Sequence, residues 1–317
     1  MKKALWLLEA GLFIIFSLPL AILPFKVSIK AGEMLGLLLF YIWGSRRRIA
    51  IENIEKSAVS FFSSANPLSS ASRPRRPACG QLSAISIARE TFKNLGRSFT
   101  EIVKIYYGFG KNIIDSVEIA GVENFNKARA NGKGILFLTG HCGNWELLGT
   151  AVAANLADIA IVARPINNPY INKFIVNGRQ RHGNSIIAKQ GALKVIIKRL
   201  RDGGCVGILM DQSVLSDEGY VIDFLGRGAW TTKMPALIAR KTGAAVLPVF
   251  IHRTDRGHGL KIYPEVELSN MDDKEKAALE DTKKFSGFIE GYIKEHPFEW
   301  LWIHRRWKRV GAGVSAK

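Results

Sequence analysis

Residues 134–148 read GILFLTGHCGNWELL, and this stretch decides the fold. Its first part, Gly134–Thr139, is a short unbroken apolar run, which predicts a buried strand. Asn144 is a favourable N-cap residue, so a helix is expected to begin at Trp145. A buried strand that passes through a short loop into a helix is the repeating unit of α/β proteins.

The same alternation continues toward the C-terminus. The further predicted strands are Ile159–Ala163, Ser185–Ala188, Cys205–Met210, Ala245–Ile251 and Leu260–Val266. The predicted helices are Trp145–Leu156, Pro169–Arg181, Ala192–Arg201, Thr232–Lys241 and Asp273–Lys294, and apolar residues at helical spacing between Ile87 and Tyr107 predict one more. Strands alternating with helices indicate an α/β fold in which a mixed sheet is flanked by helices.

The N-terminus has the composition of a membrane anchor. Ala4–Phe25 is apolar apart from Glu9, and its 22 residues would reach about 33 Å as a helix, enough to cross a bilayer core. No small-residue cleavage site follows, so an uncleaved membrane-anchoring helix is favoured over a secretory signal. Ala31–Trp43 is too short to span alone, and Arg46–Arg48 follows it. Because basic residues flank both ends, a full span and a half-inserted hairpin both stay open.

Composition divides the chain into an N-terminal anchor, residues 1–45, a main domain, residues 46–310, and a tail, residues 311–317. Within the main domain, residues 57–88 are rich in Ser, Pro and Arg and show no helical or strand period. This stretch predicts a flexible loop.

The charge balance points to an anionic partner. Lys and Arg number 45 against 27 Asp and Glu, a net charge of +18, which attracts nucleic acid, anionic membranes or phosphate-bearing and acidic partners. Trp300–Arg309 interleaves three tryptophans with basic residues, a composition typical of a membrane interface. Because the N-terminus is apolar, membrane is favoured over nucleic acid. The three cysteines, Cys79, Cys142 and Cys205, form no Cys-x-x-Cys pair, so neither a disulfide framework nor a metal site is expected.

The candidate catalytic residues follow the buried strand directly. Ligands bind at the carboxyl ends of strands in open α/β sheets, and His141 lies there with Glu146 in the first helical turn. Gly140 and Gly143 give the loop the freedom to fold the imidazole back toward the carboxylate. A neutral imidazole can then take a proton from a hydroxyl while the carboxylate holds its tautomer. No Gly-x-Ser-x-Gly elbow or phosphate-binding loop motif follows a strand, which disfavours a serine hydrolase.

Other polar residues are expected near the same edge. Arg164 follows a strand, and Arg179 and Arg181 close the next helix. Asp211 ends another strand and is open to two interpretations, a turn residue or a site carboxylate. Residues 224–232 form a glycine-containing segment before a helix, whose backbone N–H groups could receive a phosphate.

Together these motifs resemble a known family. The block from His141 to Glu146 is similar to the His-x4-acid motif of the lysophospholipid acyltransferase superfamily. The version with Glu resembles the lipid A acyltransferases of the lauroyl and myristoyl type, through further motifs in the same order. These are Arg164-Pro165, Asn168-Pro169, Arg179-x-Arg181, Met210-Asp211-Gln212, Phe224-Leu225-Gly226, Thr231-Thr232, Thr242-Gly243-Ala244 and Trp300–Lys308. The resemblance runs from about Arg46 to Arg309, and the stretch 57–88 departs from it.

The resemblance implies an acyltransferase that moves groups other than aminoacyl groups. It implies a protein of the inner membrane that faces the cytoplasm, with acyl carrier protein thioesters (or acyl-CoA) as donors and a lipid A precursor as acceptor. Neither a cofactor, a metal nor a nucleic acid is expected. His141 would be the base and Glu146 its partner. The expected substrate-binding residues are Asn144, Arg164, Arg179, Arg181, Asp211 and Thr232.

Two other functions stay open at this point. One is acylation of a phosphatidylinositol mannoside or another phospholipid with acyl-CoA as donor. The other is a non-catalytic protein whose basic and Trp-rich surfaces bind anionic membranes.

Overall fold

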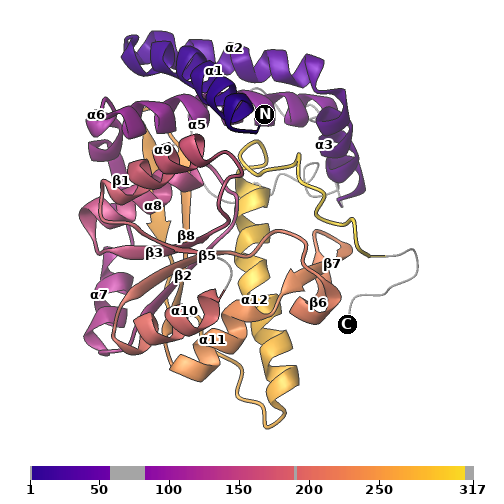
Figure 1. The fold of residues 1–317 in the computed structure, drawn as a ribbon. Helices are drawn as coiled ribbons and strands as arrows, with labels where there is room; N and C mark the ends of the chain where they lie inside the picture. Colours follow the sequence, from indigo (N-terminus) through magenta and orange to yellow (C-terminus); the bar gives the residue numbers. More distant parts are fainter. Residues whose placement is uncertain (1, 58–82, 189–190, 311–317) are drawn as a thin grey trace.

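A computed structural model describes residues 2–57, 83–188 and 191–310 (Figure 1). Within them, a seven-stranded sheet has the order β1-β9-β8-β2-β5-β3-β4, and β6 and β7 form a separate two-stranded sheet. The strands are β1 (Val117–Ala120), β2 (Ile135–Thr139), β3 (Ile159–Ala163), β4 (Ser185–Ala188), β5 (Cys205–Leu209), β6 (Gly219–Phe224), β7 (Arg227–Thr232), β8 (Ala245–Arg253) and β9 (His258–Ile262). All neighbours in the larger sheet are parallel except β8 and β9.

Helices cover both faces of the larger sheet (Figure 1). They are α1 (Lys2–Ile22), α2 (Phe25–Ile42), α3 (Gly44–Lys56), α5 (Ala84–Tyr107), α6 (Lys111–Asp115), α7 (Val122–Ala130), α8 (Trp145–Asn155), α9 (Pro169–Gln180), α10 (Ala192–Arg201), α11 (Met234–Thr242) and α12 (Lys274–Glu295), with a 3₁₀ turn at Ser216–Glu218. The predicted α/β fold, a mixed sheet flanked by helices with an apolar N-terminal helix, is therefore confirmed.

The central strand β2 supplies both cores of the domain. All five of its residues are buried. Leu136 and Leu138 belong to the cluster that includes α10, α11 and α12, whereas Ile135 and Phe137 belong to the cluster with α6, α7 and α8. Successive side chains of a strand point to opposite faces, so this short apolar run fixes both layers at once.

The N-terminal helices lie across one end of the domain and pack on α5 (Figure 1). In α2, Ser28, Gly32, Gly36 and Phe40 are buried at intervals of four residues, so they share one helix face. Gly32 meets Gly96 of α5 so closely that a Cβ at either residue would overlap the other's backbone. Among the described helices, α1 alone is long and apolar enough to cross a membrane by length and composition.

Three sequence-based expectations differ from the structure. The helix α5 begins at Ala84 with Ser83 as its N-cap, so the end of the predicted loop 57–88 is helical. Residues 58–82 and the tail 311–317 lie outside the described part of the chain. Most of the segment 224–232, interpreted as a phosphate-binding loop, is the β6–β7 hairpin, and its backbone groups pair with each other. Leu225 and Gly226 both have positive φ, as a two-residue hairpin turn requires.

The third difference concerns the C-terminal tryptophans. Trp300, Trp302 and Trp307 are 1%, 0% and 7% exposed, so they do not form a membrane interface. They pack with Phe224 in the domain core, where the guanidinium of Arg306 stacks 4.6 Å from the Phe224 ring centroid. Aromatic residues interleaved with arginines suit a buried cluster with cation–π contacts as well as a lipid interface.

Candidate active site

The loop after β2 places His141 beside Asp211, a buried carboxylate that follows β5, the strand next to β2 in the sheet. The Met210 N–H donates to the Thr139 carbonyl (3.1 Å), which continues the β2–β5 pairing and brings Asp211 against His141. His141 Nδ1 lies 2.8 Å from Asp211 Oδ1, and the His141 backbone N–H donates to Asp211 Oδ2 (2.9 Å). A carboxylate can only accept, so Nδ1 carries the proton and Nε2 is left as the basic nitrogen. Gln212 Nε2 lies 3.1 Å from His141 Nε2.

Asp211 is itself held in place and stays ionised. It is 3% exposed, and Trp300 Nε1 donates to its Oδ2 (2.8 Å). Burial raises the pKa of Asp211, but the adjacent His141 and these hydrogen bonds outweigh burial and hold that pKa well below its usual value. Burial lowers the pKa of His141, but the charge of Asp211, its hydrogen bond to the ring and the charge of Glu146 together outweigh burial, so the net shift of this pKa is upward.

Glu146 lies in the first turn of α8, as predicted, with Asn144 as the N-cap. The Glu146 carboxylate forms its hydrogen bonds with side chains other than the His141 imidazole. Arg179 donates from Nε to Oε2 (2.9 Å) and from Nη2 to Oε1 (2.5 Å), and the Tyr106 hydroxyl donates to Oε2 (2.8 Å). The bond to the ring that was expected from Glu146 is therefore made by Asp211, while the charge of Glu146 adds to the upward shift of the His141 pKa.

A cavity of about 820 Å³ opens beside these residues at the carboxyl ends of β2, β3 and β5. Its polar wall includes His141, Glu146, Arg164, Arg179, Gln212 and Thr232. The rest is largely apolar and comes from both faces of the sheet. Ile159, Ile161 and Leu148 line the side near α8, and Ile208, Ile197 and Leu237 line the side near α10 and α11. A cavity of this size with a few convergent polar groups has the character of a small-molecule site.

The structure separates the predicted substrate-binding residues into three groups. Arg164, Arg179 and Thr232 line the cavity. Asn144 and Asp211 are buried behind the loop and are not among the lining residues. Arg181 is exposed at the end of α9, outside the cavity lining.

Sequence reasoning missed three side chains of the site. Tyr106, Gln212 and Trp300 each bond directly to His141, Glu146 or Asp211. Gln212 and Trp300 stand in motifs that carry the family resemblance, but only the fold shows what they touch. Cys142, next to His141 in the chain, is fully buried, and burial raises its pKa well above the usual value, so its thiol is poorly suited to act as a nucleophile.

Comparisons with known proteins show the family of this chain. Residues 83–309 match the family of bacterial lipid A biosynthesis acyltransferases. The lipid A biosynthesis palmitoleoyltransferase of Escherichia coli (strain K12) is 26% identical over 230 residues, 72% of this chain and 73% of that protein. The lauroyltransferase of lipid A biosynthesis from the same strain is 24% identical over 298 residues, 93% of this chain and 90% of that protein. A phosphatidylinositol mannoside acyltransferase of Mycolicibacterium smegmatis is 24% identical over 197 residues, 61% of this chain and 63% of that protein. The family match spans most of the chain and includes every candidate site residue, so this protein belongs to the bacterial lipid A biosynthesis acyltransferase family.

Proposed function

We propose that this acyltransferase transfers a fatty acyl group from a thioester to a hydroxyl of a lipid A precursor, with His141 as the general base. One observation carries the proposal. His141 Nδ1 is bonded to the buried Asp211, and the ring forms part of a cavity whose remaining walls are largely apolar. Acyl transfer to a lipid requires a general base next to an apolar cavity that can hold a hydrocarbon chain.

The proposed reaction needs no acyl-enzyme intermediate. The acceptor oxygen attacks the thioester carbonyl carbon while His141 Nε2 takes the hydroxyl proton. The tetrahedral intermediate then collapses, the C–S bond breaks, and the imidazolium returns the proton to the departing thiolate. Asp211 stabilises the imidazolium between the two steps, as the carboxylate does in a Ser-His-Asp triad.

We assign the polar cavity wall to the acceptor. Arg164 is exposed at the rim, so its guanidinium can grip a phosphate with two hydrogen bonds. Arg179 already forms a bidentate pair with Glu146, which neutralises much of its charge and holds it at the wall. Glu146 therefore acts in this proposal by placing Arg179 and by adding negative charge near His141.

The proposed donor is acyl carrier protein, an acidic partner that a chain of net charge +18 attracts. The second candidate reaction uses acyl-CoA as donor and a phosphatidylinositol mannoside as acceptor, because one relative is a phosphatidylinositol mannoside acyltransferase. Both reactions would use the same base and the same cavity, so the two candidates are distinguished by identifying the acceptor lipid.

Purified protein supplied with radiolabelled acyl carrier protein thioester and a lipid A precursor should form acylated product. Lipids should also be extracted from cells that carry the gene and from cells that lack it. Mass spectrometry should then show the same acceptor lipid with and without the mass of one acyl group. Parallel reactions with acyl-CoA and a phosphatidylinositol mannoside test the second candidate. Absence of product from every donor and acceptor pair would favour a non-catalytic role at the membrane.

We further propose that the protein sits on the cytoplasmic leaflet of the inner membrane, with α1 and α2 lying flat in that leaflet. Contacts along α1 tie it to the domain. Asn168 Nδ2 at the start of α9 donates to the Trp6 carbonyl (2.8 Å), and Lys104 Nζ donates to the Ala21 carbonyl (2.9 Å). Between them, the Ser17 and Tyr107 hydroxyls lie 3.1 Å apart. A helix held to a folded domain along its length is poorly placed to pass through a bilayer.

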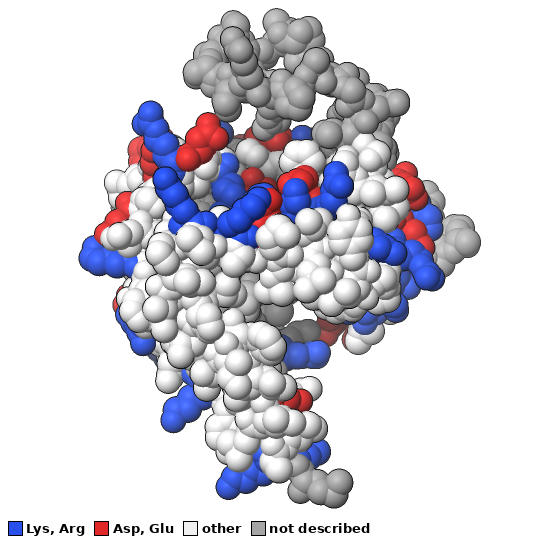
Figure 2. Space-filling model, turned by 90° about the horizontal axis from the view of Figure 1, so that it is seen from above, with Lys and Arg blue, Asp and Glu red and all other residues white. Residues whose placement is uncertain are grey.

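The outward faces of both helices are apolar. Large side chains there are 46–71% exposed, among them Leu8, Leu12, Ile15, Phe16, Met34, Leu38 and Ile42. Figure 2 views the molecule from this side and shows broad uncharged surface with Lys and Arg along its edges. Apolar surface with a basic margin suits helices that lie at the interface of an anionic leaflet.

Labelling of single cysteines should place both ends of α1 on the same side of the membrane. In a Cys79→Ser background, Lys3→Cys and Lys26→Cys should react with an impermeant maleimide in inside-out vesicles and not in spheroplasts. Glu118→Cys on β1 is exposed and reports the side of the catalytic domain. Labelling of Lys3→Cys, near the start of α1, and Lys26→Cys, at the start of α2, from opposite sides would establish that α1 spans the membrane.

A further inference from the structure

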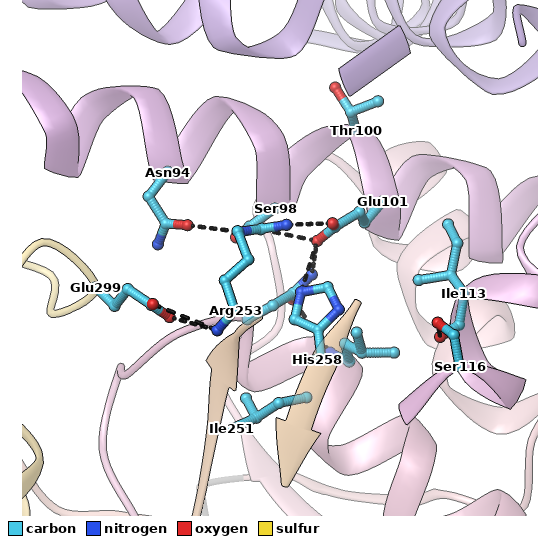
Figure 3. A network of polar contacts seen from close by, with 12 residues as sticks. Asn94, Ser98, Thr100, Glu101, Ile113, Ser116, Ile251, Arg253, His258 and Glu299 are labelled. Carbon is cyan, nitrogen blue, oxygen red and sulfur yellow. Dashed lines mark hydrogen bonds and ion pairs between the residues drawn. The ribbon is translucent and has the colours of Figure 1, made fainter. Parts of the chain in front are cut away.

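A buried ionic cluster joins α5 to the end of β8 and to Glu299 (Figure 3), and these residues do not line the cavity. At its centre is Glu101 of α5, which is 1% exposed. Arg253, at the end of β8, donates to both oxygens of this carboxylate, with Nη2 2.9 Å from Oε2. Arg253 also donates from Nε to Asn94 Oδ1 (3.0 Å) and from Nη2 to Ser98 Oγ (3.1 Å), both on α5.

Glu101 is connected to the first turn of α8 through Asn144. The Asn144 side chain uses its two ends differently: Oδ1 accepts the Leu147 N–H (3.2 Å) as the helix N-cap, and Nδ2 donates to Glu101 Oε2 (2.8 Å). Glu146 is the second residue of this helix. The position of its carboxylate, and of the Arg179 that it holds, therefore depends on the Glu101–Asn144 bond.

A second chain of hydrogen bonds, here called an arm like the one through Glu101 and Asn144, connects Arg253 to the loop through Glu299. Its carboxylate accepts the Arg253 backbone N–H at 3.2 and 3.3 Å, and its carbonyl accepts the Gly143 N–H (2.8 Å). Two residues on, the Leu301 N–H donates to the His141 carbonyl (3.1 Å). Gly143 has φ 57°, and a Cβ there would overlap the Ile251 carbonyl, so the loop lies directly against β8.

Arg253 thus joins two arms that hold the loop from both ends, one through Glu101 and Asn144 and one through Glu299. Burying such a pair costs desolvation of both ions, and replacing buried ion pairs by apolar residues often leaves stability unchanged or improves it. Burial raises the pKa of Glu101, yet His258 and Arg253 lower it to about 2, so this carboxylate is ionised throughout the neutral range. Stability alone is a poor explanation for a charged cluster at this place.

We infer that Glu101 and Arg253 are positioning residues for acyl transfer, which fix His141 and Glu146 through Asn144 and Glu299. This inference rests on the proposed function, because it assumes that the loop carries the base. Neither residue lines the cavity, so their loss should affect the rate of the chemical step more than the binding of the substrates.

The test compares two buried carboxylate–arginine pairs in the full-length protein. Glu101→Gln removes the charge that Arg253 and Asn144 bind. Asn144→Ser keeps a helix N-cap but loses the donor to Glu101. The matched control is Asp281→Asn: Asp281 is 0% exposed and bonds Arg240 Nε (2.6 Å) between α11 and α12, away from the loop.

Displacement of a catalytic group by about 1 Å can cost about 100-fold in rate. We therefore expect Glu101→Gln and Asn144→Ser to lower kcat by about 10–100-fold, with a much smaller rise in the KM for the acceptor, whose cavity wall includes Arg179. Asp281→Asn should lower the melting temperature but leave kcat close to that of the wild type. Wild-type kcat in both loop-side variants, or an equal loss in Asp281→Asn, would overturn the inference.

His141→Ala, assayed beside them, separates this inference from the proposed function. An active His141→Ala protein would overturn the proposed function itself. An inactive His141→Ala protein with fully active Glu101→Gln and Asn144→Ser would overturn only the positioning role. If Glu101→Gln does not fold, Asn144→Ser alone decides, because it leaves the Glu101–Arg253 pair in place.

Discussion

The variant His141→Ala is expected to lose about 10²–10⁴-fold in kcat, the usual contribution of a general base. The loss should fall on kcat because no other neutral base stands at this place in the described cavity wall, where the neighbours are Glu146, Arg179 and Gln212. The side chain lies at the cavity wall and is 19% exposed, so its removal leaves the sheet and both cores intact. Single-turnover acyl transfer would measure the chemical step directly.

Circular dichroism and thermal melting of the same preparation provide the control for folding. The melting temperature should stay near that of the wild type, since the loop backbone remains bonded to Leu301 and Glu299. A folded His141→Ala protein that transfers acyl groups at the wild-type rate would show that the base lies elsewhere. A fall in activity matched by a fall in folded fraction would assign His141 a structural role instead.

The segment 134–148 could be interpreted from the sequence because its signals are local. An apolar run, a glycine-containing loop and an N-cap asparagine each act within a few residues, and the structure has β2, the loop and α8 at the predicted places. The position of the site at the carboxyl ends of the strands follows from the general rule for α/β sheets.

The partner of His141 could not be predicted in this way. Asp211 is 70 residues away in the chain, and its contact with the ring depends on β5 pairing beside β2. Glu146 was expected in that role because it is near in sequence, yet its bonds go to α5 and α9, through Tyr106 and Arg179. Long-range pairing of polar side chains leaves no periodic signal.

Composition misled the interpretation of the C-terminal segment for a similar reason. Tryptophan and arginine occur together at membrane interfaces and in buried cation–π clusters, and hydropathy does not distinguish the two. Here Trp300 is needed inside, where its Nε1–H is bonded to Asp211. The apolar N-terminal helix was easier to predict from composition, but its packing on the domain depends on tertiary contacts such as Asn168 with Trp6.

Replacement of the ring's partner, Asp211→Asn, should be nearly as damaging as loss of the ring. Asparagine has the same shape, but it loses the charge that stabilises the imidazolium and can turn its amide N–H toward Nδ1, which imposes the wrong tautomer. We expect kcat to fall by about 10²–10⁴-fold. Because the two residues act as one unit, the double variant with His141→Ala should be no slower than His141→Ala alone.

The pH dependence of Asp211→Asn gives the sharper test. The base works only when it is neutral, and Asp211 raises the pKa of His141 above its ordinary value of 6.5. The wild-type kcat/KM should therefore fall on the acid side with an apparent pKa above 6.5, because kcat/KM reports ionisations of the free enzyme. Without the Asp211 carboxylate, the protonated imidazole of His141 loses the negative charge that stabilises it most. The acid limb of the kcat/KM profile of Asp211→Asn should therefore move to lower pH. Asp281→Asn, which removes a buried carboxylate remote from the ring, should leave the limb where it is. A lower rate in Asp211→Asn with an unmoved acid limb would mean that Asp211 orients the ring without setting its protonation.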